Sequence, residues 1–292
     1  MVEDFEKNGF VIKKGLFSHK DIKLYTREFD KIVNQLKDSK ENINARWGST
    51  LTSNIEHQDS MVIHTHNVQN YSSVMLQMIQ HKIFLDEVEK IIGSDIVLHH
   101  TKLFEKSPKK GAAFPLHQDW SYFPTKYNTM IAAVIHLSNS TEEMGCFRII
   151  PGSHKHGPLD NSDGHKHNPE IHSKYNLDEA HPVVANPGDV LLFDSLVWHR
   201  AGANISRKPR RGVTLVYTRS FMKQQIDLMQ CIGEDIFNRL SETGKRLAGA
   251  NVVPPKNLEQ FFLPEDKNRT VNRPPALHGG HQGPMEVYGP QK

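Results

Sequence analysis

The first third of the chain carries hydrophobic residues at helical spacing. In residues 18–36 apolar side chains recur every three or four positions, which is typical of an amphipathic helix with one buried face. Ser18 followed by Asp21 marks the start of this stretch. Residues 74–79 and 83–92 show similar spacing, and Gly93 ends the second of them because glycine tolerates left-handed backbone angles. The pattern predicts a helix in each stretch.

From about residue 95 the pattern changes to short apolar or alternating runs, broken by clusters of Gly, Pro, Asn and Ser. Such runs predict β-strands, at residues 100–106, 130–137, 146–150, 190–193 and 213–218. Helical spacing returns at residues 227–247, and prolines interrupt the tail that follows. We expect a single domain, mainly β with flanking helices: a helical region at residues 1–94, a β core at about 95–220, and a helix and tail at 221–292.

Composition and charge exclude several classes of partner. The 36 basic and 33 acidic residues nearly balance, with a net charge of +3, and no run of like charges predicts nucleic-acid binding. No apolar run is long enough for a membrane helix. Two cysteines and a first segment without a secretory pattern favour a reducing, cytoplasmic location. We expect a small-molecule substrate as partner, and no feature specifies the oligomeric state.

Three residues have the pattern of a metal site. His117 and Asp119 are two positions apart, so on an extended strand they would point to the same side. His199 ends an apolar run that begins at Asp189, after Pro187 and Gly188, and predicts a buried strand. Two imidazoles and one carboxylate on Fe(II) leave coordination positions open for other ligands. With eighteen histidines in the chain a lone His-x-Asp is weak, so the context decides.

That context is a set of segments in a familiar order. They are PLHQDWSYF at residues 115–123, GCFRIIPGSHKHG at residues 145–157 and PGDV at residues 187–190. Together with residues 5–12 and 83–93, they make the chain resemble phytanoyl-CoA dioxygenase-type proteins over roughly residues 3–220. The resemblance implies a double-stranded β-helix (jelly-roll, cupin-like) fold. It also implies a non-haem Fe(II) oxygenase that consumes 2-oxoglutarate and O2, with ascorbate expected to support activity.

The resemblance implies roles for individual residues. His117, Asp119 and His199 match the metal ligands, and Arg210 matches the arginine that binds the distal carboxylate of 2-oxoglutarate. Arginine suits this task because its planar fork donates two parallel hydrogen bonds and stays charged when desolvated. Arg211 is the competitor, since alternation along a strand lets only one of the two face inward. The family's spacing from the second histidine favours Arg210.

Further contacts to 2-oxoglutarate are expected at Lys102, on the run 100–106, and at Asn67, for which a surface turn is the alternative interpretation. The chain departs from several relatives at Ala201, where they carry a hydroxyl, and at Val134, where some carry a tryptophan. These departures affect the shape of the pocket. Aromatic and apolar residues could line a substrate cavity or belong to the core: Trp120, Tyr122, Phe123, Trp47 and Met61.

The reaction implied by the resemblance is hydroxylation of an unactivated C–H bond, or a related oxidation such as desaturation, with release of succinate and CO2. Asp119 disfavours halogenation, because related halogenases leave the carboxylate position to chloride. The substrate stays open between an acyl-CoA, a compatible solute and a secondary metabolite. Two alternatives also stay open: a non-catalytic, cupin-like metal-binding module, and a metal enzyme of this fold that uses no keto acid.

Two polar segments carry weaker expectations. Residues 38–62 form either a lid over the pocket or plain surface. The segment 158–182 contains a histidine cluster, but a second metal site is disfavoured because the spacing lacks a thiol partner and a firm element to hold it. The cluster consists of His165, His167, His172 and His181. No P-loop, G-x-S-x-G or C-x-x-C motif supports phosphoryl transfer, serine hydrolysis or thiol redox chemistry.

Overall fold

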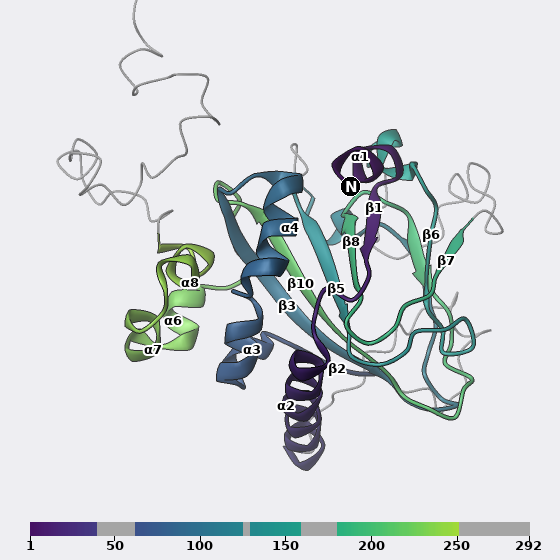
Figure 1. Ribbon diagram of the computed structural model, residues 1–292, viewed down its shortest axis with the longest axis horizontal. Coiled ribbons are helices and arrows are strands. Elements are labelled where there is room, and N and C mark those ends of the chain that lie inside the picture. Colours follow the sequence, from purple (N-terminus) through teal and green to yellow (C-terminus); the bar gives the residue numbers. More distant parts are fainter. Residues whose placement is uncertain (40–61, 125–128, 159–179, 251–292) are drawn as a thin grey trace, which may run out of the picture.

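The computed structural model describes residues 1–39, 62–124, 129–158 and 180–250, and two antiparallel sheets face each other in it (Figure 1). The larger sheet has the spatial order β1 (Phe10–Lys13), β8 (Val190–Asp194), β5 (Ile131–His136), β10 (Arg210–Arg219), β3 (Ile96–Lys106) and β2 (Val62–His66). The smaller sheet has the order β4 (Phe114–His117), β9 (His199–Ala201), β6 (Phe147–Ile149) and β7 (His181–Val183).

The chain crosses repeatedly between the two sheets from β3 to β10. β3, β5, β8 and β10 belong to the larger sheet and β4, β6, β7 and β9 to the smaller one. The last strand, β10, lies between β3 and β5, so the two ends of this region pair side by side. This is the double-stranded β-helix, or jelly roll, and it confirms the fold expected from the sequence.

Alternation along the strands divides the core into two halves. On β5, Ile131, Ala133 and Ile135 face the helices, whereas Ala132 and Val134 face the other sheet. Figure 1 shows that α2, α3 and α4 cover the face of the larger sheet that lies away from the smaller sheet; this face is called the helical side below. The helices are α1 (Val2–Asn8), α2 (His19–Ser39), α3 (Ser73–Met78), α4 (Lys82–Ile92), α6 (Leu228–Ile232), α7 (Glu234–Asn238) and α8 (Glu242–Leu247). Short 3-10 helices are η1 (Val68–Asn70), η2 (Asp119–Tyr122) and η3 (Ser153–His156).

The helices predicted in the first third are confirmed as α2, α3 and α4, and Gly93 ends α4 at a φ of 83°. The segment 227–247 is helical as expected, but it is broken into three pieces, with Gly233 at a φ of 81° between the first two. The region expected to be helical, residues 1–94, also contains the strands β1 and β2. These strands escape a pattern search because each is short, and β2 carries polar residues on its second half.

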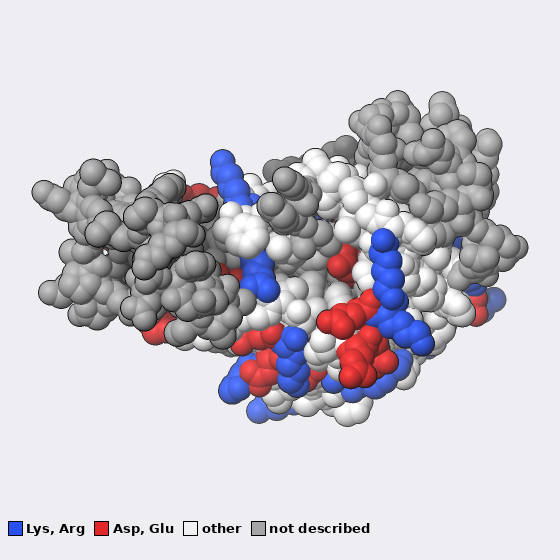
Figure 2. All heavy atoms as spheres, turned by 90° about the horizontal axis from the view of Figure 1, so that it is seen from above, with Lys and Arg blue, Asp and Glu red and all other residues white. Residues whose placement is uncertain are grey.

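The surface agrees with the balanced composition. Figure 2 shows lysine and arginine side chains interspersed with aspartate and glutamate on the face seen from above. Among the residues that the structure describes, no helix is both long and apolar enough to cross a membrane.

A buried carboxylate ties the N-terminal segment to the turn before β8. Asp189 accepts hydrogen bonds from the backbone N–H groups of Gly15, at 2.8 Å, and Asn186, at 2.9 Å, and from the ammonium of Lys14, at 3.0 Å. Burial would raise the pKa of Asp189, but these donors outweigh burial and hold the pKa below its usual value. The turn itself needs Gly188, whose φ is 95° and whose added Cβ would meet the carbonyl of Phe17 at 2.6 Å.

Asp189→Asn should lower the free energy of unfolding by about 1–3 kcal/mol near pH 7, because the amide nitrogen cannot accept the donors that converge on the carboxylate. A depressed pKa stabilises the folded state above the unfolded pKa and stops doing so as the pH falls through the folded value. The gap between wild type and variant should therefore narrow below about pH 4. Chemical denaturation across pH measures this. Asp86→Asn, which breaks only the exposed pair with Lys82, serves as the control and should behave like wild type. A gap that widens in acid would contradict the account.

Candidate metal centre

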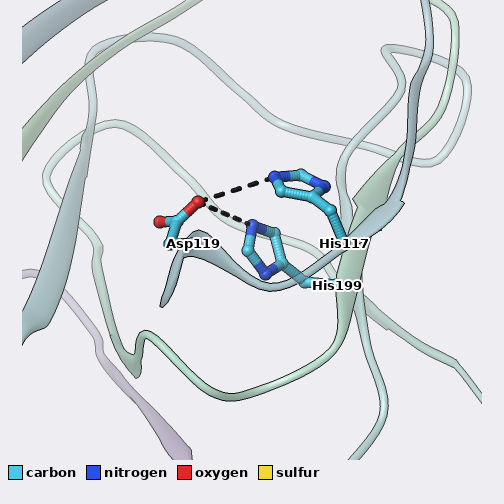
Figure 3. A group of neighbouring side chains, drawn as sticks. All are labelled: His117, Asp119 and His199. Atoms are coloured by element: carbon cyan, nitrogen blue, oxygen red, sulfur yellow. Dashed lines mark ion pairs between the residues drawn. The ribbon is translucent and has the colours of Figure 1, made fainter. Parts of the chain in front are cut away.

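Antiparallel pairing of β4 with β9 places His117 directly opposite His199. The two imidazole rings have centroids 4.3 Å apart, and both rings are buried. Asp119 lies between their outer nitrogens, with Oδ1 3.5 Å from Nε2 of His117 and 3.7 Å from Nε2 of His199 (Figure 3). One ligand atom from each residue lies within 4.8 Å of the other two. The structure thus brings together the three residues predicted as metal ligands.

Asp119 reaches this position from a turn. The sequence predicted that His117 and Asp119 share one strand, but β4 ends at His117 and Asp119 is the first residue of η2. The reason lies in Gln118, which is buried and donates from Nε2 to the carbonyls of Gly157, at 3.1 Å, and Leu196, at 2.6 Å. These bonds hold the side chain of Gln118 inward, and the chain turns immediately after it. The side chains of His117 and Asp119 still lie close together, as expected, but a turn brings them there in place of a continuous strand.

Backbone carbonyls orient both imidazoles. Nδ1 of His117 lies 2.8 Å from the carbonyl of Pro115, and Nδ1 of His199 lies 3.1 Å from the carbonyl of Val197. Only a protonated Nδ1 can donate to a carbonyl, so the neutral ring presents its lone pair at Nε2, towards Asp119. Burial, together with the neighbouring His117, lowers the pKa of His199 to about 4, although Asp119 opposes the shift. The neutral imidazole is the form that coordinates a metal ion.

Asp119 is held as a carboxylate. Burial would raise its pKa, but the adjacent imidazoles of His117 and His199 and the nearby ammonium of Lys102 outweigh burial and hold the pKa well below its usual value. An ionised carboxylate and two neutral imidazoles are the donor set of a site with open coordination positions.

The three candidate ligands line a cavity of about 270 Å³ between the two sheets. At one end its wall includes Arg210 and His136, and at the other it includes Lys102, His64 and Tyr122. Apolar side chains form most of the wall between: Phe104, Phe114, Val134, Phe147, Phe193 and Val216. A mostly apolar wall with a few convergent polar groups is typical of a small-molecule site.

Arg210 carries a buried positive charge at its end of the cavity. Its guanidinium donates to the carbonyl of Gly145 and lies 5.3 Å from the ring of Phe147. Burial lowers its pKa to about 10, with Cys146 opposing, so the group stays charged at neutral pH. No carboxylate within the described ranges pairs with it. Arg211 instead bonds to Glu105, at 2.8 Å, and to Asp30 of α2, at 3.1 Å, on the helical side of the sheet.

A second buried basic side chain, that of Lys106, lies opposite Arg210 in the pairing of β3 with β10. Its ammonium donates to the carbonyl of Gly202 and lies 4.7 Å from the ring of Phe114. Burial and the charge of Arg210 lower the pKa of Lys106 well below its usual value. Lys106 was not predicted from the sequence, although alternation from Lys102 along β3 would have placed it on the inner face.

Two loops approach each other closely at this end. Gly145 has a φ of 70°, and a Cβ added to it would collide with the carbonyl oxygens of Gly202 and Ala203. The carbonyl of Gly145 accepts from Arg210 and that of Gly202 accepts from Lys106. The absence of a side chain at Gly145 therefore permits the contact that directs both carbonyls towards the two cations.

The other two residues predicted to contact 2-oxoglutarate, Lys102 and Asn67, do not lie beside Arg210. Lys102 faces the cavity near Tyr122 and Asp119, far along β3 from Arg210. Asn67 does not line the cavity; it adopts a φ of 56° before η1, and its backbone N–H donates to the carbonyl of Thr101. This is the turn given as the alternative interpretation.

Of the residues predicted for the substrate, Tyr122 lines the cavity and Trp120 does not. Phe123 packs against His99, with ring centroids 4.6 Å apart, and against the core between the sheets. Trp47 and Met61 lie outside the described residues, as do residues 40–61 of the expected lid and most of the histidine cluster; His181 lies exposed on β7. Three further residues of the cavity wall, His64, His136 and Thr214, were not predicted from the sequence.

Comparison with known proteins agrees with this geometry. The family described as Phytanoyl-CoA dioxygenase (PhyH) matches residues 5–212. Phytanoyl-CoA dioxygenase, peroxisomal, of Bos taurus is 29% identical over 225 residues, which cover 72% of this chain and 65% of that protein. The 2-aminoethylphosphonate dioxygenase of an uncultured bacterium is 26% identical over 221 residues, covering 74% of this chain and 79% of that protein.

The matched region spans about half the length of an uncharacterized protein of Mycobacterium tuberculosis, which is 30% identical over 151 residues and matches 52% of this chain. Among solved structures, the epimerase SnoN in complex with Fe3+, alpha ketoglutarate and nogalamycin RO superposes with a TM-score of 0.63 at 21% identity. It covers 80% of this chain and 90% of its own. That likeness shows the shared fold. The match of one family to more than two thirds of the sequence settles the classification: the chain belongs to the phytanoyl-CoA dioxygenase family.

Proposed function

We propose that the protein is a non-haem Fe(II)- and 2-oxoglutarate-dependent dioxygenase that oxidises an unactivated C–H bond of a small organic molecule. One observation carries this proposal: His117, Asp119 and His199 converge at one cavity, and the same cavity is bordered by the buried guanidinium of Arg210, which pairs with no carboxylate of the described residues. A metal site and a carboxylate anchor within one pocket are what a keto acid that chelates the metal requires. Family membership supports the same reaction class.

The donor set fits ferrous iron. Two imidazole nitrogens and one carboxylate oxygen on one side of an ion leave the opposite side for a bidentate keto acid and O2. No thiolate is part of the group that the structure brings together. When bound, the ferrous ion would supply the redox chemistry that couples oxidative decarboxylation of 2-oxoglutarate to oxidation of the substrate. One oxygen atom of O2 then ends in succinate and the other in the hydroxylated product, with CO2 as the remaining product.

The chain's own residues bind and orient. The carbonyls of Pro115 and Val197 keep both imidazole lone pairs directed at the metal position. The guanidinium of Arg210 would donate hydrogen bonds to the distal carboxylate of 2-oxoglutarate, in a charge-assisted pair that is strong because the site is buried. Phe147 and Phe193 border the cavity beside His199, with ring centroids 5.9 and 4.8 Å from its imidazole, and keep water away from that side.

The proposed substrate is a small organic molecule, with an acyl-CoA and a secondary metabolite as the candidates from sequence. Relatives differ in the substrates that their names give, phytanoyl-CoA for one and 2-aminoethylphosphonate for another. A panel assay under air with Fe(II), ascorbate and 2-oxoglutarate separates the candidates by succinate formation. A branched acyl-CoA should stimulate succinate release where the free acid does not, if the acyl-CoA is the substrate.

Metal binding should stabilise the fold, because an ion that binds only the native state raises the free energy of unfolding. Addition of Fe(II) without oxygen, or of Mn(II), should raise the melting temperature of the full chain, and Asp119→Ala or His199→Ala should abolish the rise. Differential scanning fluorimetry and measured metal content check this. His181→Ala removes an exposed imidazole and should keep the full rise. A rise that survives in both ligand variants would place the ion elsewhere.

Arg210→Met should raise the KM for 2-oxoglutarate about tenfold or more, since a hydrogen bond to a charged group contributes roughly 1.5–3 kcal/mol. Arg211→Met should instead lower the melting temperature through its lost contacts with Glu105 and Asp30, and leave this KM unchanged. Succinate formation at varied 2-oxoglutarate measures both. Equal KM effects in the two variants would reject Arg210 as the anchor.

The assay also decides between an enzyme and a metal-binding module. Wild type should form succinate from 2-oxoglutarate above the level of Asp119→Ala. If metal binds but no member of the panel, nor 2-oxoglutarate alone, gives succinate above that level, the protein is a binding module or an enzyme that needs no keto acid.

A further inference from the structure

The cavity carries another positive charge away from Arg210. In the pairing of β3 with β10, Arg210 lies opposite Lys106, and Thr214 lies opposite Lys102, four positions further along. Strands rise roughly 3.3 Å per residue, so the two positions are on the order of 13 Å apart along the sheet. A short keto acid whose distal carboxylate binds Arg210 does not bring that carboxylate to Lys102. One carboxylate therefore cannot bind both cations.

Lys102 lacks an anionic partner of its own among the residues that the structure describes. Within these stretches of the chain its ammonium makes no hydrogen bond or ion pair, and the ring of Tyr122 lies 5.7 Å from it. Burial lowers the pKa of Lys102, and the nearby Asp119 only partly offsets the effect. That carboxylate is assigned to the metal, so it cannot fully neutralise Lys102 as well. A partly buried ammonium without an anionic partner loses hydration at a cost, and an anionic ligand offsets that cost.

The side chains near Lys102 are mainly imidazoles, which do not neutralise its charge as an acidic residue would. His64 lies on the cavity wall and packs edge-on against His66, with ring centroids 4.6 Å apart, and His66 stacks on His100 at 5.9 Å. His99 has no partner in the register of β3 with β10, and this bulge brings His99 and His100 together, with their Nδ1 atoms 2.6 Å apart. Burial, together with His66 and Lys102, lowers the pKa of His64 to about 4, so this ring is a neutral donor at physiological pH.

Three strands thus contribute polar side chains to the cavity wall around Lys102, with His64 at the level of Phe104, two positions along β3 from Lys102. Lys102 comes from β3, His64 from β2, and the hydroxyl of Thr214, directly opposite Lys102, from β10. On the basis of the function proposed above, we propose that Lys102, His64 and Thr214 bind a phosphonate or phosphate group of a small organic substrate. The proximity of Lys102 to Asp119 places this group close to the metal, so the oxidised carbon lies within a few bonds of the anion.

The donors favour a tetrahedral oxyanion over a carboxylate. A carboxylate is matched by the planar fork of arginine, whereas lysine acts as a point charge that suits the several oxygens of a phosphate or phosphonate. Size argues in the same direction. At about 270 Å³ the cavity lies just below the roughly 300–1,000 Å³ typical of small-molecule sites, and it must also hold the keto acid. A coenzyme A thioester, whose phosphates are far from the acyl carbons, cannot place an anion beside the metal.

Calorimetric titration of the full chain with propylphosphonate and with butyrate tests the subsite, because the two probes share a propyl chain and differ in the head group. The titrations are made with and without Fe(II) and saturating 2-oxoglutarate, under nitrogen. Propylphosphonate should bind, and butyrate should bind at least about fivefold more weakly. Lys102→Met should weaken propylphosphonate binding about tenfold or more, because a charge-assisted contact is lost, and Thr214→Val should weaken it by a smaller factor. Lys102→Arg should restore some of the affinity.

Lys223→Met is the matched control, since it removes an exposed lysine and should bind propylphosphonate as wild type does. Circular dichroism of each variant establishes that it is folded, and Thr214→Val keeps the test decisive if Lys102→Met is not. Wild type that binds neither probe, or binds butyrate more tightly, overturns the proposal. A Lys102→Met variant that loses affinity for 2-oxoglutarate but keeps affinity for propylphosphonate also overturns it, and leaves the dioxygenase function standing. Absence of succinate formation under any condition would instead defeat the dioxygenase function itself.

Discussion

The pairing of two short strands, β4 and β9, is the constraint on which the site depends. It sets His117 opposite His199, two residues that are 82 positions apart in the sequence. Ladder hydrogen bonds fix the spacing of the two backbones, and the carbonyls two residues before each histidine fix the rotation of the rings. Asp119 needs only a single turn of chain after His117 to complete the group. Loss of this register would separate the ligands even if each side chain remained.

The inward face of the jelly roll is unusually polar for a protein core. Arg210 and Lys106 lie buried beside each other, and Lys102 lies further along the same strand pair. Charges of one sign in a poorly solvated space repel and lose hydration, so they oppose folding in the absence of anions. The helical side of the same sheet is apolar and supplies the compensating stability. The outer face of the larger sheet thus contributes stability, and its inner face carries the polar groups available to a ligand.

Much of this arrangement could be predicted from sequence. The helices α2 and α4 were visible as three-or-four-residue spacing, and β5, β8 and β10 as apolar runs, because long periodic segments carry the strongest signals. The grouping of His117, Asp119 and His199 as candidate metal ligands was predicted from their spacing and from the order of the segments that contain them. The turn at Asp119 could not be foreseen, because it depends on bonds from Gln118 to two loops distant in sequence. The polar wall formed by His64, His136 and Thr214 was hidden for the same reason, since it exists only after the strands have paired.

The contact at Gly145 divides the pocket into a part that the main chain determines and a part that side chains determine. Main-chain atoms of the β5–β6 and β9–β10 connections determine where the paired guanidinium and ammonium are held, and any residue other than glycine would push those connections apart. Side chains set the remainder of the pocket, and side chains change by single substitutions. Substitutions along β2 and β3 can therefore reshape the pocket without moving the loop contact that positions Arg210 and Lys106.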